Sequence, residues 1–360
     1  MNCFVSSCTS QTASLRTIAA RSEFCPASLP LLSQNFRRVR QDHTFSLRAS
    51  KRAAATMSTS SSTVGFLGLG IMGYPMAKNL VSKAGRSLIV WNRDAQKSQS
   101  LVKELGSDSV QVAASPSEVI QRCDVTFVML STPAAVHSVL LEMPNAVVEG
   151  VSAGKYIIDC STIAEQDSLR SAAAIRSAGG KFLEAPVSGS KVPAEMGALI
   201  FLTAGDREVF DLVGEEQGLL AAMGKKSLFL GDVGKGARMK MAVNMVMGSM
   251  VAAFAEGMVL CECNELGTAD FLEVLDAGAM SNPMFRLKGP NMVKGEHLPH
   301  FPLEHQQKDM RFALQMGDSS NTSMPVAAAA NELFKTAKGL GHSRDDMSAV
   351  VEALRTTKKE

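Results

Sequence analysis

The feature that most constrains the fold is a set of three glycines, Gly68, Gly70 and Gly73, spaced as Gly-x-Gly-x-x-Gly. They follow an apolar run at residues 64–68 and open a helical pattern. There the first glycine permits a tight turn, the second lets the backbone approach a pyrophosphate, and the third lets the helix pack closely on the strand. A glycine-rich turn without a ligand is the alternative. The context favours a dinucleotide loop at a helix N-terminus, formed by Gly68, Leu69, Gly70, Ile71, Met72 and Gly73.

Apolar runs of strand length alternate with amphipathic helical patterns after this loop. Strands are expected at residues 64–68, 87–91, 110–113, 125–130, 156–160, 181–185, 199–204 and 227–230. Helical patterns such as residues 75–84, 98–105 and 166–178 lie between most of them. This alternation predicts an α/β fold with a Rossmann-like, doubly wound and mostly parallel sheet.

The pattern changes near Gly231. After it, helices are expected at residues 237–266, 269–276, 303–316 and 326–338. We therefore predict a cofactor-binding domain at residues 63–230 and an all-helical domain at residues 231–355. The first of these helices is apolar and long, but polar side chains interrupt it at Arg238, Lys240, Asn244, Glu256 and Glu262. A helix buried between domains is expected rather than a membrane span, and no membrane partner.

The first 57 residues have a composition of their own. They hold eight Lys or Arg and two Asp or Glu, a net charge of +6, and are rich in Ser and Ala. This composition predicts an organelle transit peptide, with a disordered tail as the alternative. Plastid and mitochondrion both stay open, and Met57 could start a cytosolic form. The rest of the chain, with 29 basic and 33 acidic residues, predicts no nucleic-acid partner.

Four cysteines lie outside that region, at Cys123, Cys160, Cys261 and Cys263. Their number and spacing imply no disulfide framework. Cys261 and Cys263 are two residues apart in a helical pattern and point to different faces, so no shared metal is expected. Both are predicted to be small core residues.

The end of the second strand is expected to select the cofactor. NAD-binding proteins place an acidic residue there, about 20 residues after the glycine loop. This chain has Asn92 and Arg93, and an amide followed by a guanidinium suits a 2′-phosphate, which predicts NADPH. Asp94 could instead contact the ribose and favour NAD, but it is also suited to cap the next helix.

Two small polar segments are expected at the carboxyl edge of the sheet. Ser161 and Thr162 end one strand where a nicotinamide would lie. The turn Ser188-Gly189-Ser190 ends another and can bind a carboxylate through hydroxyls and amides. Each segment could also be only a helix cap or a turn.

Lys240 and Asn244 lie four residues apart and share a face of the first long helix. A buried lysine beside an amide can polarise a carbonyl oxygen and donate a proton to it, provided that the chain also holds a hydride source. The plain alternative is a lysine paired with a structural acid.

These segments resemble the β-hydroxyacid dehydrogenase family, at residues 68–73, 159–162, 185–190 and 234–244. The resemblance covers residues 63–355, and residues 278–285, 301–309 and 324–330 are similar to aldehyde reductases of plant organelles within the family. It implies Lys240 as an active-site residue, Thr162 and Lys308 as cofactor contacts, and NADPH as the cofactor. One departure is Glu184, where many members have Asp.

The resemblance also implies a reaction, the reduction of glyoxylate to glycolate and of succinic semialdehyde to 4-hydroxybutyrate. Lys240 would donate the proton, Asn244 would orient it, and Ser161 with the turn at Ser188 would hold the carboxylate of a small aldehyde-acid substrate. The alternatives are an NAD-dependent 3-hydroxyisobutyrate dehydrogenase and a cofactor-binding scaffold without catalysis. Retention of Lys240 disfavours the scaffold. A homo-oligomer formed through the helical domain is also expected.

Overall fold

The computed structural model describes residues 63–216 and 218–355; the predicted transit peptide at residues 1–57 lies outside them. The first part is a sheet with strands β1 (Thr63–Leu67), β2 (Ser87–Trp91), β3 (Val110–Val112), β4 (Val125–Val128), β5 (Tyr156–Asp159), β6 (Lys181–Glu184), β7 (Val187–Ser188), β8 (Leu199–Gly205) and β9 (Gly224–Phe229). The helices between them are α2 (Gly73–Ser82), α3 (Ala95–Leu105), α4 (Pro116–Arg122), α5 (Pro133–His137), α6 (Val147–Gly150), α7 (Glu165–Ser177), α8 (Lys191–Met196), α9 (Arg207–Val213) and α10 (Leu219–Met223), with a π-helix at Ser138–Glu142.

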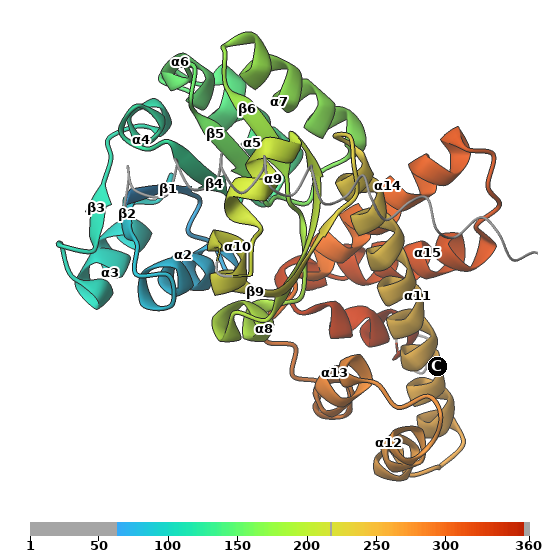
Figure 1. Ribbon diagram of the computed structural model, residues 1–360. Coiled ribbons are helices and arrows are strands. Elements are labelled where there is room, and N and C mark those ends of the chain that lie inside the picture. The colour runs from blue at the N-terminus through green and yellow to red at the C-terminus, as the bar shows by residue number, and fades with distance from the viewer. Residues whose placement is uncertain (1–62, 217, 356–360) are drawn as a thin grey trace, which may run out of the picture. The chain divides into compact units, whose positions relative to one another are not determined.

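The strands pair in the order β3-β2-β1-β4-β5-β6-β8-β7, with β9 beside β8 (Figure 1). The first six of this order are parallel to their neighbours, whereas β8 is antiparallel to β6 and β7. The order reverses between β1 and β4, and such a switch point opens a crevice at the carboxyl ends of the strands. The predicted doubly wound, mostly parallel sheet is confirmed.

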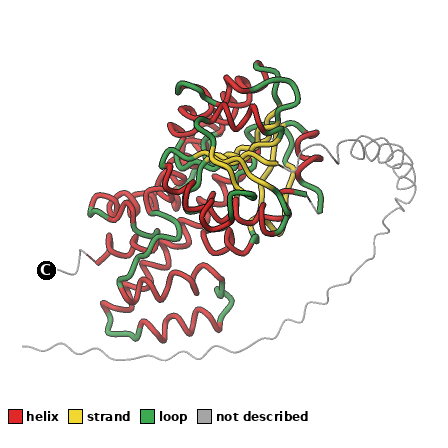
Figure 2. The backbone as a smooth tube through the Cα atoms, turned by 90° about the vertical axis from the view of Figure 1, so that its left-hand side faces the viewer, coloured by secondary structure: helices red, strands yellow, loops and turns green. Residues whose placement is uncertain are grey.

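Alternate side chains of the central strands fill two cores, one on each face of the sheet. Phe66, Val90 and Phe127 pack with α2 and α3 on one face. Leu67 and Ile89 pack with α4 and α7 on the other. Figure 2 shows the strands as a layer with helices on both sides. Burial of both faces explains why the strands are nearly continuous apolar runs in the sequence.

The second part is helical in its described residues (Figure 1). It contains α11 (Lys235–Cys263), α12 (Thr268–Ala277), α13 (Pro283–Lys294), α14 (Leu303–Ser319), α15 (Pro325–Gly339) and α16 (Glu352–Arg355), with 3-10 turns at His342–Arg344 and Met347–Val351. α11 packs against α14 and α15 and also contacts β8 and α7, so it joins the helical part to the sheet. By length and composition α11 could cross a membrane, and 44% of its most apolar window is buried within the protein.

Several expectations were wrong in detail. Ser188, expected in a turn, belongs with Val187 to the short strand β7, which pairs with β8. α13 was not expected because Pro290, which lacks a backbone N–H, lies inside it. β9 starts three residues early, at Gly224, because its polar first residues hide the strand pattern. Cys263 is exposed at the end of α11 and is not a core residue.

Candidate active site

The three glycines of the loop between β1 and α2 have different surroundings. Gly68 has a φ of +95°, and a Cβ on it would lie 2.3 Å from the carbonyl oxygen of Met129. A Cβ on Gly73 would lie 1.9 Å from the carbonyl oxygen of Gly68. A Cβ on Gly70 would meet nothing within 4 Å. Gly68 and Gly73 are therefore required by the chain itself, whereas Gly70 leaves open space beside the backbone.

This open space fits a dinucleotide. α2 begins with no side-chain cap and with no acidic residue in its first turn, so no side chain competes with an anion there, although the N–H of Tyr74 already donates to the carbonyl oxygen of Gly70 at 3.1 Å. Leu69, Ile71 and Met72 complete the loop between Gly68 and α2. A pyrophosphate approaching Gly70 would occupy the volume that a side chain would otherwise fill.

Asn92, Arg93 and Asp94 follow β2 beside this loop. The Asn92 side chain accepts a hydrogen bond from the backbone N–H of Leu69 at 2.8 Å and ties the loop to the end of β2. Asp94 caps α3 by accepting from the N–H of Gln96 at 3.1 Å, which confirms the predicted cap. Arg93 is exposed, and within the described part of the chain its guanidinium has no hydrogen-bond or ion-pair partner. The cation is thus available to a ligand, while the carboxylate of Asp94 is engaged.

Lys240 and Asn244 are both buried on α11. The ammonium of Lys240 donates to Oδ1 of Asn244 at 2.9 Å, its one hydrogen-bond partner among residues 63–216 and 218–355. An ammonium has three donors, so two remain for a ligand. Burial lowers the pKa of Lys240 to about 8, although the charge of Asp309 opposes the shift. The ammonium of Lys240 is therefore more acidic than that of an exposed lysine.

The structure adds Asp309, which the sequence analysis did not select. The Asn244 amide nitrogen donates to Oδ2 of Asp309 at 2.6 Å, which fixes the amide with its oxygen toward Lys240. Oδ1 of Asp309 lies 3.0 Å from Nζ of Lys308. Lys308 in turn donates to the carbonyl oxygen of Thr162 at 2.6 Å. A chain of contacts therefore runs from Lys240 to the edge of the sheet, and it brings four predicted site residues together.

Gln306 is a second residue that the sequence analysis missed. It is buried on α14 and donates to the backbone carbonyl of Asn244 at 2.9 Å. Gly248 makes room for it, since a Cβ there would lie 2.2 Å from its Nε2. A Gln-x-x-Asp spacing on one helix face, three residues apart, is the signal that could have indicated both Gln306 and Asp309.

The two small polar segments, at Ser161 and at the turn Ser188-Gly189-Ser190, differ in the hydrogen bonds that their side chains already make. Ser161 is buried, and its hydroxyl accepts from the N–H of Leu130 at 3.0 Å, which links the ends of β4 and β5. Ser188 is half-buried at the end of β7, which α11 contacts. Gly189 has a φ of +133°, and Ser190 precedes α8 without capping it through its side chain. The second segment therefore keeps more of its polar groups available.

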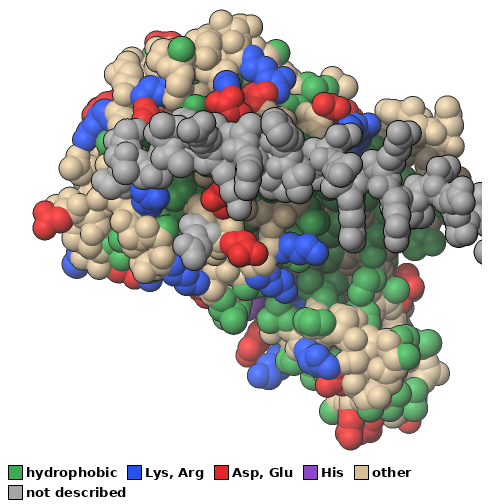
Figure 3. Space-filling model, viewed as in Figure 1, with side chains coloured by type: hydrophobic (Ala, Val, Ile, Leu, Met, Phe, Trp, Pro, Cys, Tyr) green, Lys and Arg blue, Asp and Glu red, His purple; other side chains and the backbone are tan. Residues whose placement is uncertain are grey.

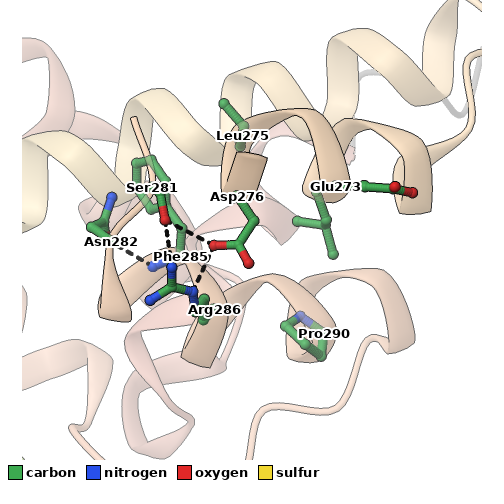
Figure 4. Close-up of a pocket in the computed structure, with 9 residues that line it drawn as sticks. Glu273, Leu275, Asp276, Ser281, Asn282, Phe285, Arg286 and Pro290 are labelled. Carbon is green, nitrogen blue, oxygen red and sulfur yellow. Dashed lines mark hydrogen bonds and ion pairs between the residues drawn. The ribbon is translucent and has the colours of Figure 1, made fainter. Parts of the chain in front are cut away.

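A pocket of about 270 Å³ lies elsewhere, between α12 and α13 (Figure 4). None of the predicted site residues lines it. Arg286, which lines the pocket, donates from its guanidinium to Oδ1 of Asp276 at 2.6 Å, and the hydroxyl of Ser281 donates to the same oxygen at 2.9 Å. Because these polar groups are paired with one another, the candidate site remains at the sheet edge.

The fold, the glycine loop and the buried lysine define a nicotinamide-dinucleotide-dependent oxidoreductase. Residues 63–231 match the family model of the NAD binding domain of 6-phosphogluconate dehydrogenase. Residues 234–354 match the model described as NAD-binding of NADP-dependent 3-hydroxyisobutyrate dehydrogenase. The chain belongs to the β-hydroxyacid dehydrogenase family, which confirms the resemblance and a nicotinamide dinucleotide as the cofactor.

Two plant proteins and one crystal structure illustrate this membership. The chain is 50% identical over 296 residues to glyoxylate/succinic semialdehyde reductase 1 of Arabidopsis thaliana, covering 82% of this chain and 99% of the relative. It is 48% identical to the chloroplastic reductase 2 of the same plant, covering 82% and 80%. A 3-hydroxyisobutyrate dehydrogenase from Salmonella typhimurium matches with a TM-score of 0.73 and 26% identity, covering 81% of this chain and 99% of that one.

Proposed function

We propose that this protein is an NADPH-dependent reductase that converts glyoxylate to glycolate and succinic semialdehyde to 4-hydroxybutyrate. The observation that carries the proposal is the buried Lys240, with two donors left over and a pKa of about 8, on a helix docked against the sheet. The choice of aldehydes is supported by the names of the two Arabidopsis relatives. Residues 63–230 would hold the cofactor, and residues 231–355 would bring the proton donor.

The mechanism assigns each residue of this chain a separate task. When bound, the reduced nicotinamide would supply a hydride to the aldehyde carbon. Lys240 would polarise the carbonyl oxygen and donate a proton to it, a contribution of about 10²- to 10⁴-fold. Asn244, held by Asp309, would keep Lys240 pointed at that oxygen. Lys308 and Thr162 would close the nicotinamide side of the site, since they already bond to each other.

The substrate carboxylate would bind at the turn Ser188-Gly189-Ser190. Its hydroxyls and backbone amides supply donors without a fixed charge, which suits a small acid. Ser161, whose hydroxyl oxygen accepts from the N–H of Leu130, would assist from the end of β5. Both aldehydes carry the carboxylate that this turn requires.

A steady-state comparison of the two aldehydes with NADPH and NADH tests this function. The proposal expects turnover of both aldehydes, with NADPH preferred. A chain that instead oxidised 3-hydroxyisobutyrate with NAD and reduced neither aldehyde would be the alternative dehydrogenase. A chain without activity on any of these substrates would be the scaffold.

Arg93 carries the preference for NADPH. Replacing Arg93 by Ala should raise the Kd for NADPH by about tenfold or more and leave the Kd for NADH nearly unchanged, because a charged hydrogen bond to phosphate is lost. The matched control is Lys97→Ala, which removes an exposed cation from the neighbouring helix α3 and should change neither Kd. Fluorescence titration measures both values. Equal losses for NADPH and NADH in Arg93→Ala would refute the assignment.

We propose a plastid, a mitochondrion or both as the compartment. The basic, Ser-rich composition of residues 1–57 supports import, and a relative with a chloroplastic form supports the plastid. A fluorescent protein fused after residue 57 should enter one or both organelles, whereas a fusion that begins at Met57 should stay in the cytosol. Diffuse cytosolic fluorescence from the first fusion would contradict the proposal.

A homo-oligomer is proposed as the working form. Hydrophobic side chains gather on the surface over α11 (Figure 3), and Met239, Val243, Val246 and Met250 are exposed along one stripe of it. Apolar surface of this kind supports contact with a second copy. Light scattering of the purified chain would give a monomer mass if the proposal is wrong. No membrane or nucleic-acid partner is proposed.

A further inference from the structure

Glu184 is buried at the end of β6, where it meets the first turn of α11. Its Oε1 accepts hydrogen bonds from the N–H groups of Gly234 at 2.8 Å, Gly236 at 2.7 Å and Ala237 at 3.4 Å. Its other oxygen accepts from the hydroxyl of Ser168 on α7. The first amides of a helix have no acceptor within the helix. Glu184 therefore caps α11 from a different element of the fold.

The chain is closely packed around this contact. Gly234 is the N-cap residue of α11, with a φ of +99° and no side chain to offer. A Cβ on Gly236 would lie 2.4 Å from the carbonyl oxygen of Leu202 on β8 and 3.0 Å from Oε1 of Glu184. The first turn of α11 thus packs closely against β8, and the Glu184 carboxylate lies beside it.

The same helix carries Lys240, four residues after Gly236 and on the same face. A helix is a stiff element, so a shift of its first turn displaces Lys240 relative to β7 and the end of β5. Asn244 is held from the other side, through Asp309 on α14. Lys240 therefore lies between one anchor on the sheet and one on the helical part.

We propose that Glu184 is a positioning residue, which sets the place of Lys240 against the sheet by capping α11. This inference rests on the proposed function, because it assumes Lys240 as the proton donor. Glu184 acts through the helix backbone: within the described residues its hydrogen bonds go to the amides of α11 and to Ser168, and that of Lys240 goes to Asn244. Glu184 thus connects the end of β6 to the helix that carries Lys240.

We expect the hydrogen bonds of Glu184, rather than its negative charge, to hold α11 in place. Burial raises the pKa of the Glu184 carboxyl, and the hydrogen bonds from Ser168 and the α11 amides oppose that shift. A glutamine has the same length, can accept from the three amides through its oxygen, and can donate to Ser168 through its nitrogen. A methionine has a similar length but cannot accept these hydrogen bonds effectively. Comparison of Glu184→Gln with Glu184→Met therefore separates the effect of the hydrogen bonds from the effect of side-chain size.

The test uses the full chain in three measurements: hydrogen–deuterium exchange over residues 234–244, the Kd for NADPH, and kcat for aldehyde reduction. Glu184→Gln should match the wild type in all three. Glu184→Met should exchange faster at the start of α11 and lose kcat on the order of 10- to 100-fold, because a displacement near 1 Å can cost about 10²-fold. Its Kd for NADPH should stay within about twofold, since the cofactor loop is untouched. Glu118→Met is the control. Glu118 lies on α4, away from α11, and also accepts a hydrogen bond from a backbone N–H, that of Ala114 at 2.8 Å.

The outcomes separate the inference from the function on which it rests. Faster exchange in Glu184→Met with an unchanged kcat would show that the cap is only structural, and this would overturn the inference. Unchanged exchange would also overturn it, because Glu184 would then not hold the first turn of α11. If Glu184→Met does not fold, Glu184→Asp, with a shorter carboxylate, should show the same pattern with a smaller loss of kcat, and a normal kcat there would also overturn it. A wild-type chain that reduces neither aldehyde would refute the proposed function, while exchange would still report on the cap.

Discussion

Lys240 combines two opposing influences on its proton. Burial and, to a smaller extent, the charge of Lys308 disfavour the ammonium, and the carboxylate of Asp309, reached through Asn244, favours it. The result is a pKa of about 8, well below that of an exposed lysine. A general acid works best when its pKa lies near the working pH. The charge of Asp309 therefore favours a protonated Lys240 at neutral pH, while burial makes the proton easier to transfer.

This balance predicts how the reaction depends on pH. The donor must be protonated, so kcat/KM for aldehyde reduction should be constant below pH 8 and fall about tenfold per pH unit well above it. Asp309→Asn removes the charge that raises the pKa of Lys240, so the alkaline fall should move to lower pH. Asp318→Asn, an exposed acid on the same helix, is the control. A fall that stays in place or moves upward in Asp309→Asn would contradict the role of Asp309.

Single residues also mark how far the sequence could be interpreted. Lys240 and Asn244 could be selected because their spacing is local to one helix. Asp309 could not, because its contact with Asn244 joins positions 65 residues apart and depends on how α14 packs on α11. Glu184 was noted only as a departure from a pattern. Its meaning depends on three amides that the fold brings to it.

Among the elements, the loop between β1 and α2 contains one glycine expected to matter for cofactor binding and another expected to matter also for the stability of the fold. Gly70→Ala should leave the melting temperature unchanged and weaken NADPH binding about 10- to 100-fold, because its Cβ would occupy the open space that suits the pyrophosphate. Gly73→Ala should also destabilise the fold by about 1–3 kcal/mol, since its Cβ would collide with the backbone at Gly68.

Thermal unfolding and fluorescence titration of the two variants check this prediction. Gly339→Ala, at the end of α15, has nothing within 4 Å of the added Cβ and serves as the control for a glycine replaced in open space. It should change neither the melting temperature nor NADPH binding. Equal destabilisation by Gly70→Ala and Gly73→Ala, or normal NADPH binding in Gly70→Ala, would contradict the assignment of the loop.

Elements with a strong local pattern were predictable, and those fixed by tertiary contacts were not. β2 matches its expected range, and α15 (Pro325–Gly339) is one residue longer at each end than the expected helix at residues 326–338. β7 has only two residues and exists because β8 offers it a partner. α13 tolerates Pro290 because packing against the rest of the helical part outweighs the lost hydrogen bond.

At the scale of the whole molecule, the alternation of strands and helices was enough to predict the doubly wound sheet and the change to helices. The way in which the two parts meet was not predictable, because it depends on contacts distant in sequence. Lys308 bonds to Thr162 across 146 positions, and Glu184 bonds to Gly236 across 52. These contacts bring residues of the sheet and of the helical part into one site.

The central claim is that Lys240 donates the proton in an NADPH-dependent aldehyde reduction. The direct test measures kcat with glyoxylate and with succinic semialdehyde, and the Kd for NADPH, in Lys240→Ala. Lys235→Ala, an exposed lysine in the first turn of the same helix, is the control. We expect Lys240→Ala to lose about 10²- to 10⁴-fold in kcat with an unchanged Kd for NADPH. Near-normal turnover with unchanged NADPH affinity would contradict the account.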